Sequence, residues 1–146
     1  MEHQLIEDNI HCLGDYVEQT FTRYADKPAF HCLWQTFSFS EMDKKSRDLA
    51  CWFQHCSNLK AGDRIIIQLP NLIQYPVVAY AAMRVGLVIV NTNPLYTPRE
   101  MQHQFKDSGA KAIVILEDLL PKLDKVRANT DIETVIITRA SDFLTG

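Results

Sequence analysis

Glycine is scarce in this chain, and the phosphate-binding loops that depend on it do not occur. The 146 residues contain only five glycines, and neither a G-x-G-x-x-G nor a G-x-x-x-x-G-K-[ST] pattern is present. The turn after the first strand of the expected parallel sheet, residues 69–72, has no glycine at all. We therefore expect no nucleotide site that these residues could form by themselves.

Positive charge is also in short supply. The formal net charge is -3 at pH 7, whereas proteins that bind nucleic acid usually carry a basic patch. We expect no nucleic-acid partner.

Long apolar runs are interrupted. The most apolar stretch, residues 65–90, is long enough for a membrane span, but polar and helix-breaking residues divide it. These are Pro70, Asn71, Gln74, Pro76 and Arg84. A strand, a turn, a helix and a second strand explain the stretch better than a membrane span.

The beginning of the chain does not resemble a secretory leader, because residues 1–11 include acids and have no continuous apolar segment. We therefore predict a cytoplasmic protein in which the cysteines are free and buried. The four cysteines are Cys12, Cys32, Cys51 and Cys56.

Three of these cysteines follow a histidine, which raises the question of a metal site. The pairs are His11-Cys12, His31-Cys32 and His55-Cys56, and Cys51 lies four residues before His55. The pairs fall on different predicted elements, and no C-x-x-C pattern occurs. Core cysteines with surface histidines are the favoured interpretation, and no metal site is predicted.

The first third of the chain predicts a helix, a β-hairpin and a second helix. Apolar spacing of three and four residues indicates the first helix, and short apolar runs indicate the hairpin. The second helix would be capped by Ser40. The expected ranges are 10–25 for the first helix, 29–33 and 36–39 for the strands, with Trp34 and Gln35 between them, and 41–56 for the second helix.

The remainder predicts strands that alternate with helices, which indicates a mostly parallel sheet with right-handed connections. The strands are 64–69, 87–90, 111–116 and 133–138, of which 87–90 is expected to be short and buried. The helices are 72–85, with Asn71 as its expected cap, 98–108 and 118–127. The fold class is therefore α/β, with the order β-α-β-α-β-α-β. Residues 1–146 form one unit, in which 1–58 cap the parallel core of 59–146.

Catalytic constellations are not evident in the sequence. No G-x-S-x-G elbow occurs, and no serine or cysteine can be tied to a histidine and a carboxylate. Capping and solvation explain the acids at helix ends and on polar faces, namely Glu41, Asp43, Glu100, Asp107, Glu117 and Asp118. Tyr96 and Arg99 are the best candidates for a functional surface, although a structural role is favoured for both. No catalytic, cofactor-binding or metal-binding residue is assigned.

Several phrases in the sequence resemble the N-terminal region of acyl-CoA synthetases in the adenylate-forming superfamily, most closely bacterial long-chain fatty-acid–CoA ligases. The resemblance covers residues 12–140 in the expected order. The phrases are Gly62-Asp63-Arg64, Leu69-Pro70-Asn71, Met83-Arg84-Val85-Gly86 and Asn93-Pro94-Leu95-Tyr96-Thr97-Pro98-Arg99-Glu100.

The resemblance implies an enzyme that joins a fatty acid to coenzyme A, with ATP and Mg²⁺, through an acyl-adenylate. The family's phosphate loop and its C-terminal lysine have no counterpart in these residues. The chain is therefore expected to be part of the N-terminal domain of a larger enzyme, to be inert alone, and to pack against the remainder of that enzyme. Peripheral attachment of the parent to the inner face of the membrane stays open.

Two alternatives also stay open, which are a stand-alone binding or assembly module derived from the family and a small α/β enzyme with an unseen site. The all-apolar helix segment 77–83 and the strands buried on both faces further predict an uncovered apolar face and self-association.

Overall fold

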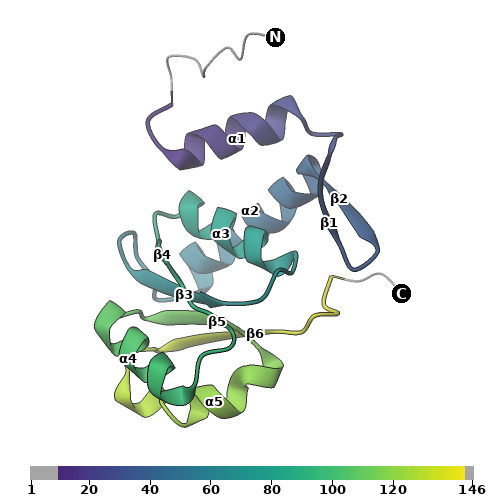
Figure 1. Ribbon diagram of the computed structural model, residues 1–146. Coiled ribbons are helices and arrows are strands. Elements are labelled where there is room, and N and C mark those ends of the chain that lie inside the picture. Colours follow the sequence, from purple (N-terminus) through teal and green to yellow (C-terminus); the bar gives the residue numbers. More distant parts are fainter. Residues whose placement is uncertain (1–9, 144–146) are drawn as a thin grey trace.

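Strand β3 (Arg64–Gln68) lies inside a parallel sheet of four strands in the computed structural model, which describes residues 10–143. Strand β4 (Val88–Asn91) pairs with one side of β3 and β5 (Ala112–Leu116) with the other, and β6 (Thr134–Thr138) pairs with β5. The order is β4-β3-β5-β6. The predicted alternation of strands and helices and the parallel arrangement are confirmed (Figure 1).

Helices cover both faces of the sheet (Figure 1). On one face, α2 (Phe39–Cys56) and α3 (Gln74–Arg84) pack on Ile65, Ile67 and Val114. On the other, α4 (Pro98–Ser108) and α5 (Leu120–Asp124) pack on Ile66, Ile113 and Ile115. Because alternate residues of a strand point to opposite faces, the isoleucine runs supply both cores.

A third layer is built from the N-terminal segments. Helix α1 (Leu13–Arg23) and the hairpin of β1 (Pro28–Cys32) and β2 (Gln35–Ser38) enclose a smaller apolar cluster with α2 and α3. Its buried members are Phe21, Phe37, Met42, Ile73 and Val77. The predicted cap on the parallel core therefore has its own small core.

The hairpin turn lies one residue earlier than predicted. Cys32 pairs with Gln35, so the turn residues are Leu33 and Trp34, with φ angles of 47° and 71°. Two-residue turns with both central residues at positive φ match the twist of the flanking strands, and they normally contain glycine or asparagine. Neither residue gives that signal, which explains why the sequence misplaced the turn.

The cap of α2 was also misassigned. Ser38, not Ser40, precedes the helix, and its Oγ accepts a hydrogen bond from the Glu41 N–H over 3.2 Å. The Glu41 carboxylate in turn accepts one from the Ser38 N–H over 2.7 Å. This reciprocal pair needs a three-residue spacing, which Ser38 has and Ser40 lacks.

Two further helix predictions need correction. Helix α3 begins at Gln74, and Asn71 lies before it in a bend instead of capping it. The single helix predicted over residues 118–127 is a 3₁₀ turn at Glu117–Leu119, the short α5, and a second 3₁₀ turn at Arg127–Asn129. Pro121 lies in the first turn of α5, where its missing N–H costs no helical hydrogen bond.

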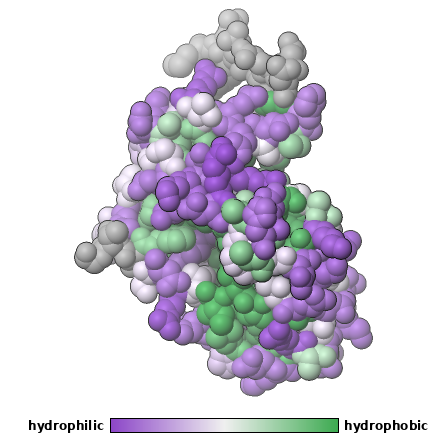
Figure 2. Space-filling model, turned by 180° about the vertical axis from the view of Figure 1, so that it is seen from behind, coloured by the Kyte–Doolittle hydropathy of each residue, from purple (hydrophilic) through white to green (hydrophobic). Residues whose placement is uncertain are grey.

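The outer strands are less buried than expected. In β4 and β6, Val88 and Ile137 are 48% and 51% exposed, although β4 was predicted to be a buried strand. Strands at the edge of a sheet have a neighbour on one side only. The face opposite to that of Figure 1 carries a patch of apolar side chains over its lower half (Figure 2).

The cysteines are free, as predicted, but they are not buried. Cys12, Cys51 and Cys56 are exposed, and Cys32 is half-buried. Cys51 and Cys56 lie on the outer side of α2, whereas Ala50 and Phe53 take the positions that face the core. Among residues 10–143, no three histidine, cysteine or acidic side chains are grouped so that they could hold a metal ion. Over the same residues, no helix is long and apolar enough to cross a membrane.

Candidate functional site

The carboxyl ends of the strands are the natural place to look for a site in this topology. The chain passes from β3 to β4 on one side and then to β5 on the other. In open α/β sheets, ligands bind outside the carboxyl ends of the strands where the order reverses in this way. That position lies between the ends of β3 and β5.

Gln68 is the polar side chain at this position. It ends β3, is fully buried, and its Nε2 donates to the Asn93 carbonyl over 3.3 Å. Its Oε1 has no hydrogen-bond partner. A buried amide normally finds hydrogen-bond partners for both its nitrogen and its oxygen. Gln68 therefore holds the loop after β4 at the energetic cost of one unpaired buried oxygen.

A second group of polar side chains fixes that loop further. Gln104 of α4 donates to the Asn91 carbonyl over 3.0 Å and accepts from the Thr92 hydroxyl over 2.7 Å. The Tyr75 hydroxyl donates to Asn91 Oδ1 over 2.8 Å. Helices on both faces of the sheet therefore hold one loop through main-chain and side-chain bonds.

The end of β6 is held in a similar way. Gln74 Nε2 donates to the Arg139 carbonyl over 2.6 Å. The Arg139 guanidinium makes two bonds of 2.7 Å to the Glu117 carboxylate, which follows β5. The guanidinium lowers the pKa of the Glu117 carboxyl group below its ordinary value.

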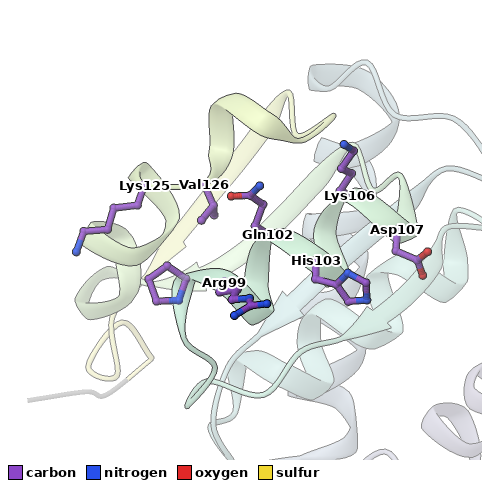
Figure 3. A pocket seen from close by; sticks show the side chains of 8 residues that line it. Arg99, Gln102, His103, Lys106, Asp107, Lys125 and Val126 are labelled. Carbon is purple, nitrogen blue, oxygen red and sulfur yellow. The ribbon is translucent and has the colours of Figure 1, made fainter.

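Arg99 lies in a different place, on the outer side of α4. It lines a shallow hollow of about 810 Å³ with Gln102, His103, Lys106 and Lys125, and none of its three cations has an ion-pair partner within residues 10–143. Figure 3 shows that Arg99, Gln102, His103 and Lys106 lie along α4, that Lys125 comes from the end of α5, and that the side chains do not converge. Asp107 also lines the hollow, so the surface carries charges of both signs.

Tyr96 does not join Arg99 in this hollow. Its ring packs on the cluster beneath α4 and α5, and its carbonyl accepts a hydrogen bond from Lys122 Nζ over 3.1 Å. The two best sequence candidates are therefore separated, and the structure gives Tyr96 a packing contact.

One hydroxyl lies against an imidazole, which is the kind of pair that a nucleophile requires. Thr36 Oγ1 and His31 Nδ1 are 2.7 Å apart across the hairpin. Both residues are exposed, and within the described part of the chain no carboxylate is bonded to the imidazole. The pair is a cross-strand contact on the hairpin.

Sequence reasoning missed the residues that organise the loops, Gln68, Gln74 and Gln104. A signal existed for Gln68, because a single amide at the end of a β-branched strand buried on both faces must find a partner. No comparable signal marks Gln74 or Gln104, since glutamine is common on exposed helix faces.

Comparison with known proteins places these observations in context. The model of the family described as AMP-binding enzyme matches residues 17–146. A long-chain-fatty-acid–CoA ligase of Escherichia coli O6:H1 is 44% identical over 137 residues, which are 94% of this chain and 24% of that protein. The corresponding ligase of Bacillus subtilis is 32% identical over 132 residues, 90% of this chain and 23% of that protein.

Among solved structures, a long-chain-fatty-acid-CoA ligase from Archaeoglobus fulgidus superimposes with a TM-score of 0.79 at 24% identity. The superposition covers 89% of this chain and 29% of that one. The chain thus spans about a quarter of the length of the relatives it matches, and the structural likeness supports the fold.

Proposed function

Because this chain belongs to the AMP-binding enzyme family over residues 17–146, we propose that it is the N-terminal scaffold of a long-chain fatty-acid–CoA ligase. The observation that carries the proposal is the identity of 44% to ligases of that name. A 4-coumarate–CoA ligase is only 31% identical over a similar length. Because the long-chain ligase of Bacillus subtilis is itself only 32% identical, the preference for a long-chain acid rests on the relatives of that name at 40% to 44% identity.

In the proposed reaction a fatty acid carboxylate attacks the α-phosphorus of ATP and displaces pyrophosphate. The thiol of coenzyme A then takes the acyl group from the resulting acyl-adenylate and releases AMP. Such steps depend on positioned cations around the phosphates. We assign neither Mg²⁺ ligands nor catalytic residues to residues 10–143, and we propose that this part is inert alone.

The proposed contribution of these residues is positional. Gln68, Gln104 and Tyr75 hold the loop after β4, and Gln74 holds the segment after β6. Rigid loops at the carboxyl ends of the strands would give the rest of the enzyme a fixed surface on which to build its site. We place the enzyme in the cytoplasm, where ATP and coenzyme A are available as its partners.

A chimeric enzyme tests the proposal. The 137 residues that match in the E. coli relative would be replaced by those of this chain, and acyl-CoA formation from palmitate, ATP and coenzyme A would be measured. A folded chimera should retain turnover, whereas the 146-residue chain alone should release no pyrophosphate. A folded chimera without adenylation, or pyrophosphate release by the chain alone, would contradict the proposal.

The chimera also offers a matched control. Gln68→Met should reduce palmitate turnover, because it keeps the length of the side chain but removes the amide that bonds to the Asn93 carbonyl. Gln54→Met, the same change at an exposed position of α2, should leave turnover nearly unchanged. If the two variants behave alike while the fold is intact, the positional role of the Gln68 amide is wrong.

A further inference from the structure

Helix α1 is the least buried of the longer helices. It lies on the side of α2 and α3 that faces away from the sheet (Figure 1). Phe21 is the one buried residue among its eleven, whereas six of the eleven residues of α3 are buried. Leu13 and Tyr16 of α1 are 59% and 42% exposed. A segment with so few buried contacts opens at a lower free energy than the core of the same protein.

The two main side-chain contacts of α1 both reach Arg84 at the end of α3. The Glu18 carboxylate accepts a hydrogen bond from the Arg84 guanidinium, and the Phe21 ring centroid lies 5.5 Å from the Arg84 Cζ. The Phe21 ring also packs edge-on against Tyr80 of α3, with 5.2 Å between the ring centroids. Because one guanidinium receives both the charged and the aromatic contact, we expect the two contacts to break together.

Arg84 keeps a partner when α1 leaves. Asp43 of α2 accepts a hydrogen bond from a second nitrogen of Arg84 over 2.6 Å. Arg47, which bonds to Glu18 over 2.7 Å, likewise keeps its contact of 2.9 Å with Asp43. Opening α1 therefore removes Glu18 and Phe21 from a cation that stays paired, and this costs less than leaving a buried charge without any partner.

The chain that follows α1 is fixed to the start of α2. The Phe39 N–H donates to the Lys27 carbonyl over 3.0 Å. The Ser40 N–H donates to the Ala25 carbonyl over 2.9 Å. A turn separates these bonds from Arg23, the last residue of α1. This turn lets α1 swing outward while the hairpin and α2 keep their own contacts.

We propose that α1 is a strap that opens about the turn after Arg23 while the parallel core stays folded, and that the contact between Glu18 and Arg84 is the catch that holds it closed. Opening removes Phe21 from the apolar cluster that it shares with Phe37 and Val77. Because the Glu18 side chain is 39% exposed, dissolved salt should weaken the catch. All these contacts lie within residues 10–143, so the strap does not depend on ligase activity.

Hydrogen exchange of the full 146-residue chain, followed by mass spectrometry, tests the strap. The protection factors of the α1 amides should be at least about tenfold lower than those of β3 and β5. Raising NaCl from about 20 to about 500 mM should lower the α1 protection several-fold and leave the sheet unchanged. If α1 and the sheet show the same protection under both conditions, α1 does not open by itself and the proposal is wrong.

Glu18→Gln tests the catch, because it keeps the size of the side chain and removes its charge. We expect α1 to exchange about five- to tenfold faster in this variant and to lose most of its dependence on salt. Asp48→Asn is the matched control, since Asp48 forms an exposed ion pair with Lys44 on α2, and it should leave the exchange of α1 unchanged. Equal effects of the two substitutions, or a salt dependence that persists in Glu18→Gln, would overturn the proposal.

A double-substitution cycle tests whether Arg84 is the partner that matters. Arg84→Met should accelerate the exchange of α1 by at least the factor found for Glu18→Gln, and the protection of β3 shows whether the variant is still folded. Adding Glu18→Gln to Arg84→Met should accelerate α1 less than about twofold further, because the contact is already lost. If the two factors multiply instead, Glu18 does not act through Arg84 and the proposed catch is wrong.

Discussion

Arg84 at the end of α3 donates a hydrogen bond to Asp43 of α2 over 2.6 Å, and through a second nitrogen it also bonds to Glu18 of α1. Arg47 completes the network by pairing with both acids, at 2.9 Å to Asp43 and 2.7 Å to Glu18. The side chain of Arg84 is only 9% exposed, and burial lowers the pKa of its guanidinium group. Three helices thus meet at one cation.

Replacing that cation should destabilise the N-terminal layer. We expect Arg84→Ala to lower the free energy of unfolding by about 2 to 3 kcal/mol, because two carboxylates lose a largely buried partner and their exposure softens the penalty. Arg47→Ala should cost less than about 1 kcal/mol, since its side chain is 56% exposed. Urea denaturation would measure both, and equal losses would contradict the central role of Arg84.

The corrected cap of α2 gives a paired test. Ser38→Ala removes the hydroxyl that accepts from the Glu41 N–H, and we expect a loss of about 1 kcal/mol. Ser40→Ala, two residues further along, should change the free energy of unfolding by less than about 0.5 kcal/mol. Thermal denaturation would distinguish the two serines, and a larger effect at Ser40 would restore it as the cap.

The same cap predicts a pH dependence. The Ser38 N–H and hydroxyl lower the pKa of Glu41 below its ordinary value of 4.5. The unfolded chain therefore takes up a proton at higher pH than the folded one, and stability is lost as the pH falls from the ordinary value through the folded pKa. Glu41→Gln should flatten the acid side of the stability curve, as measured by urea midpoints above and below pH 4.5. An unchanged slope would show that the carboxylate is not held by the cap.

The two buried glutamines should respond differently to an apolar substitution of similar length. Gln68 makes one long bond of 3.3 Å and leaves its Oε1 unpaired, so Gln68→Met should be neutral or stabilising by up to about 1 kcal/mol. Gln74 also leaves its Oε1 unpaired, but its Nε2 donates at 2.6 Å, and Gln74→Met should cost about 1 kcal/mol because the Arg139 carbonyl keeps only the long bond of 3.4 Å from the Thr138 hydroxyl. Chemical denaturation of both variants checks this order, and the reverse order would contradict it.

Two glycines at the turn beside β3 and β4 allow the cost of backbone strain to be distinguished from the cost of a steric clash. Gly62 and Gly86 have φ angles of 89° and 74°, and the Gly62 N–H donates to the Gly86 carbonyl. A Cβ at Gly62 would meet nothing within 4 Å, whereas one at Gly86 would lie 3.2 Å from the Ala61 Cβ. We expect Gly62→Ala to cost about 1 kcal/mol from the backbone alone and Gly86→Ala to cost more. Similar melting temperatures would mean that Ala61 moves aside.

The parallel core could be predicted because several local signals agree there. Isoleucine and valine runs mark β3 and β5, and Thr97, Pro98 and Glu100 mark the start of α4, as confirmed by the reciprocal bonds between Thr97 and Glu100. Gly109 ends that helix with a φ of 60°. Where capping, turn and burial patterns all indicate the same element, the sequence alone is enough to predict that element.

The sequence predictions failed at positions whose structure is set by a contact with a distant part of the chain. The turn at Leu33 and Trp34 is set by strand register, and the exposure of Cys51 depends on which side of α2 meets the sheet. Asp43 was assigned to capping and solvation, yet it bonds to Arg84, which lies 41 residues further along the chain, a pairing that local spacing does not reveal. The polar groups at the carboxyl ends of the strands were missed for the same reason.

The sheet order has a consequence for the newly made chain. Of the four strands of the parallel sheet, β3 is synthesised first. It gains its second neighbour only when β5 has been made, because Ile66 pairs with Ile113. Contacts between residues so far apart in sequence slow folding and leave apolar strands uncovered in the meantime. During synthesis, Ile65, Ile66 and Ile67 therefore stay without their second neighbouring strand until β5 has left the ribosome.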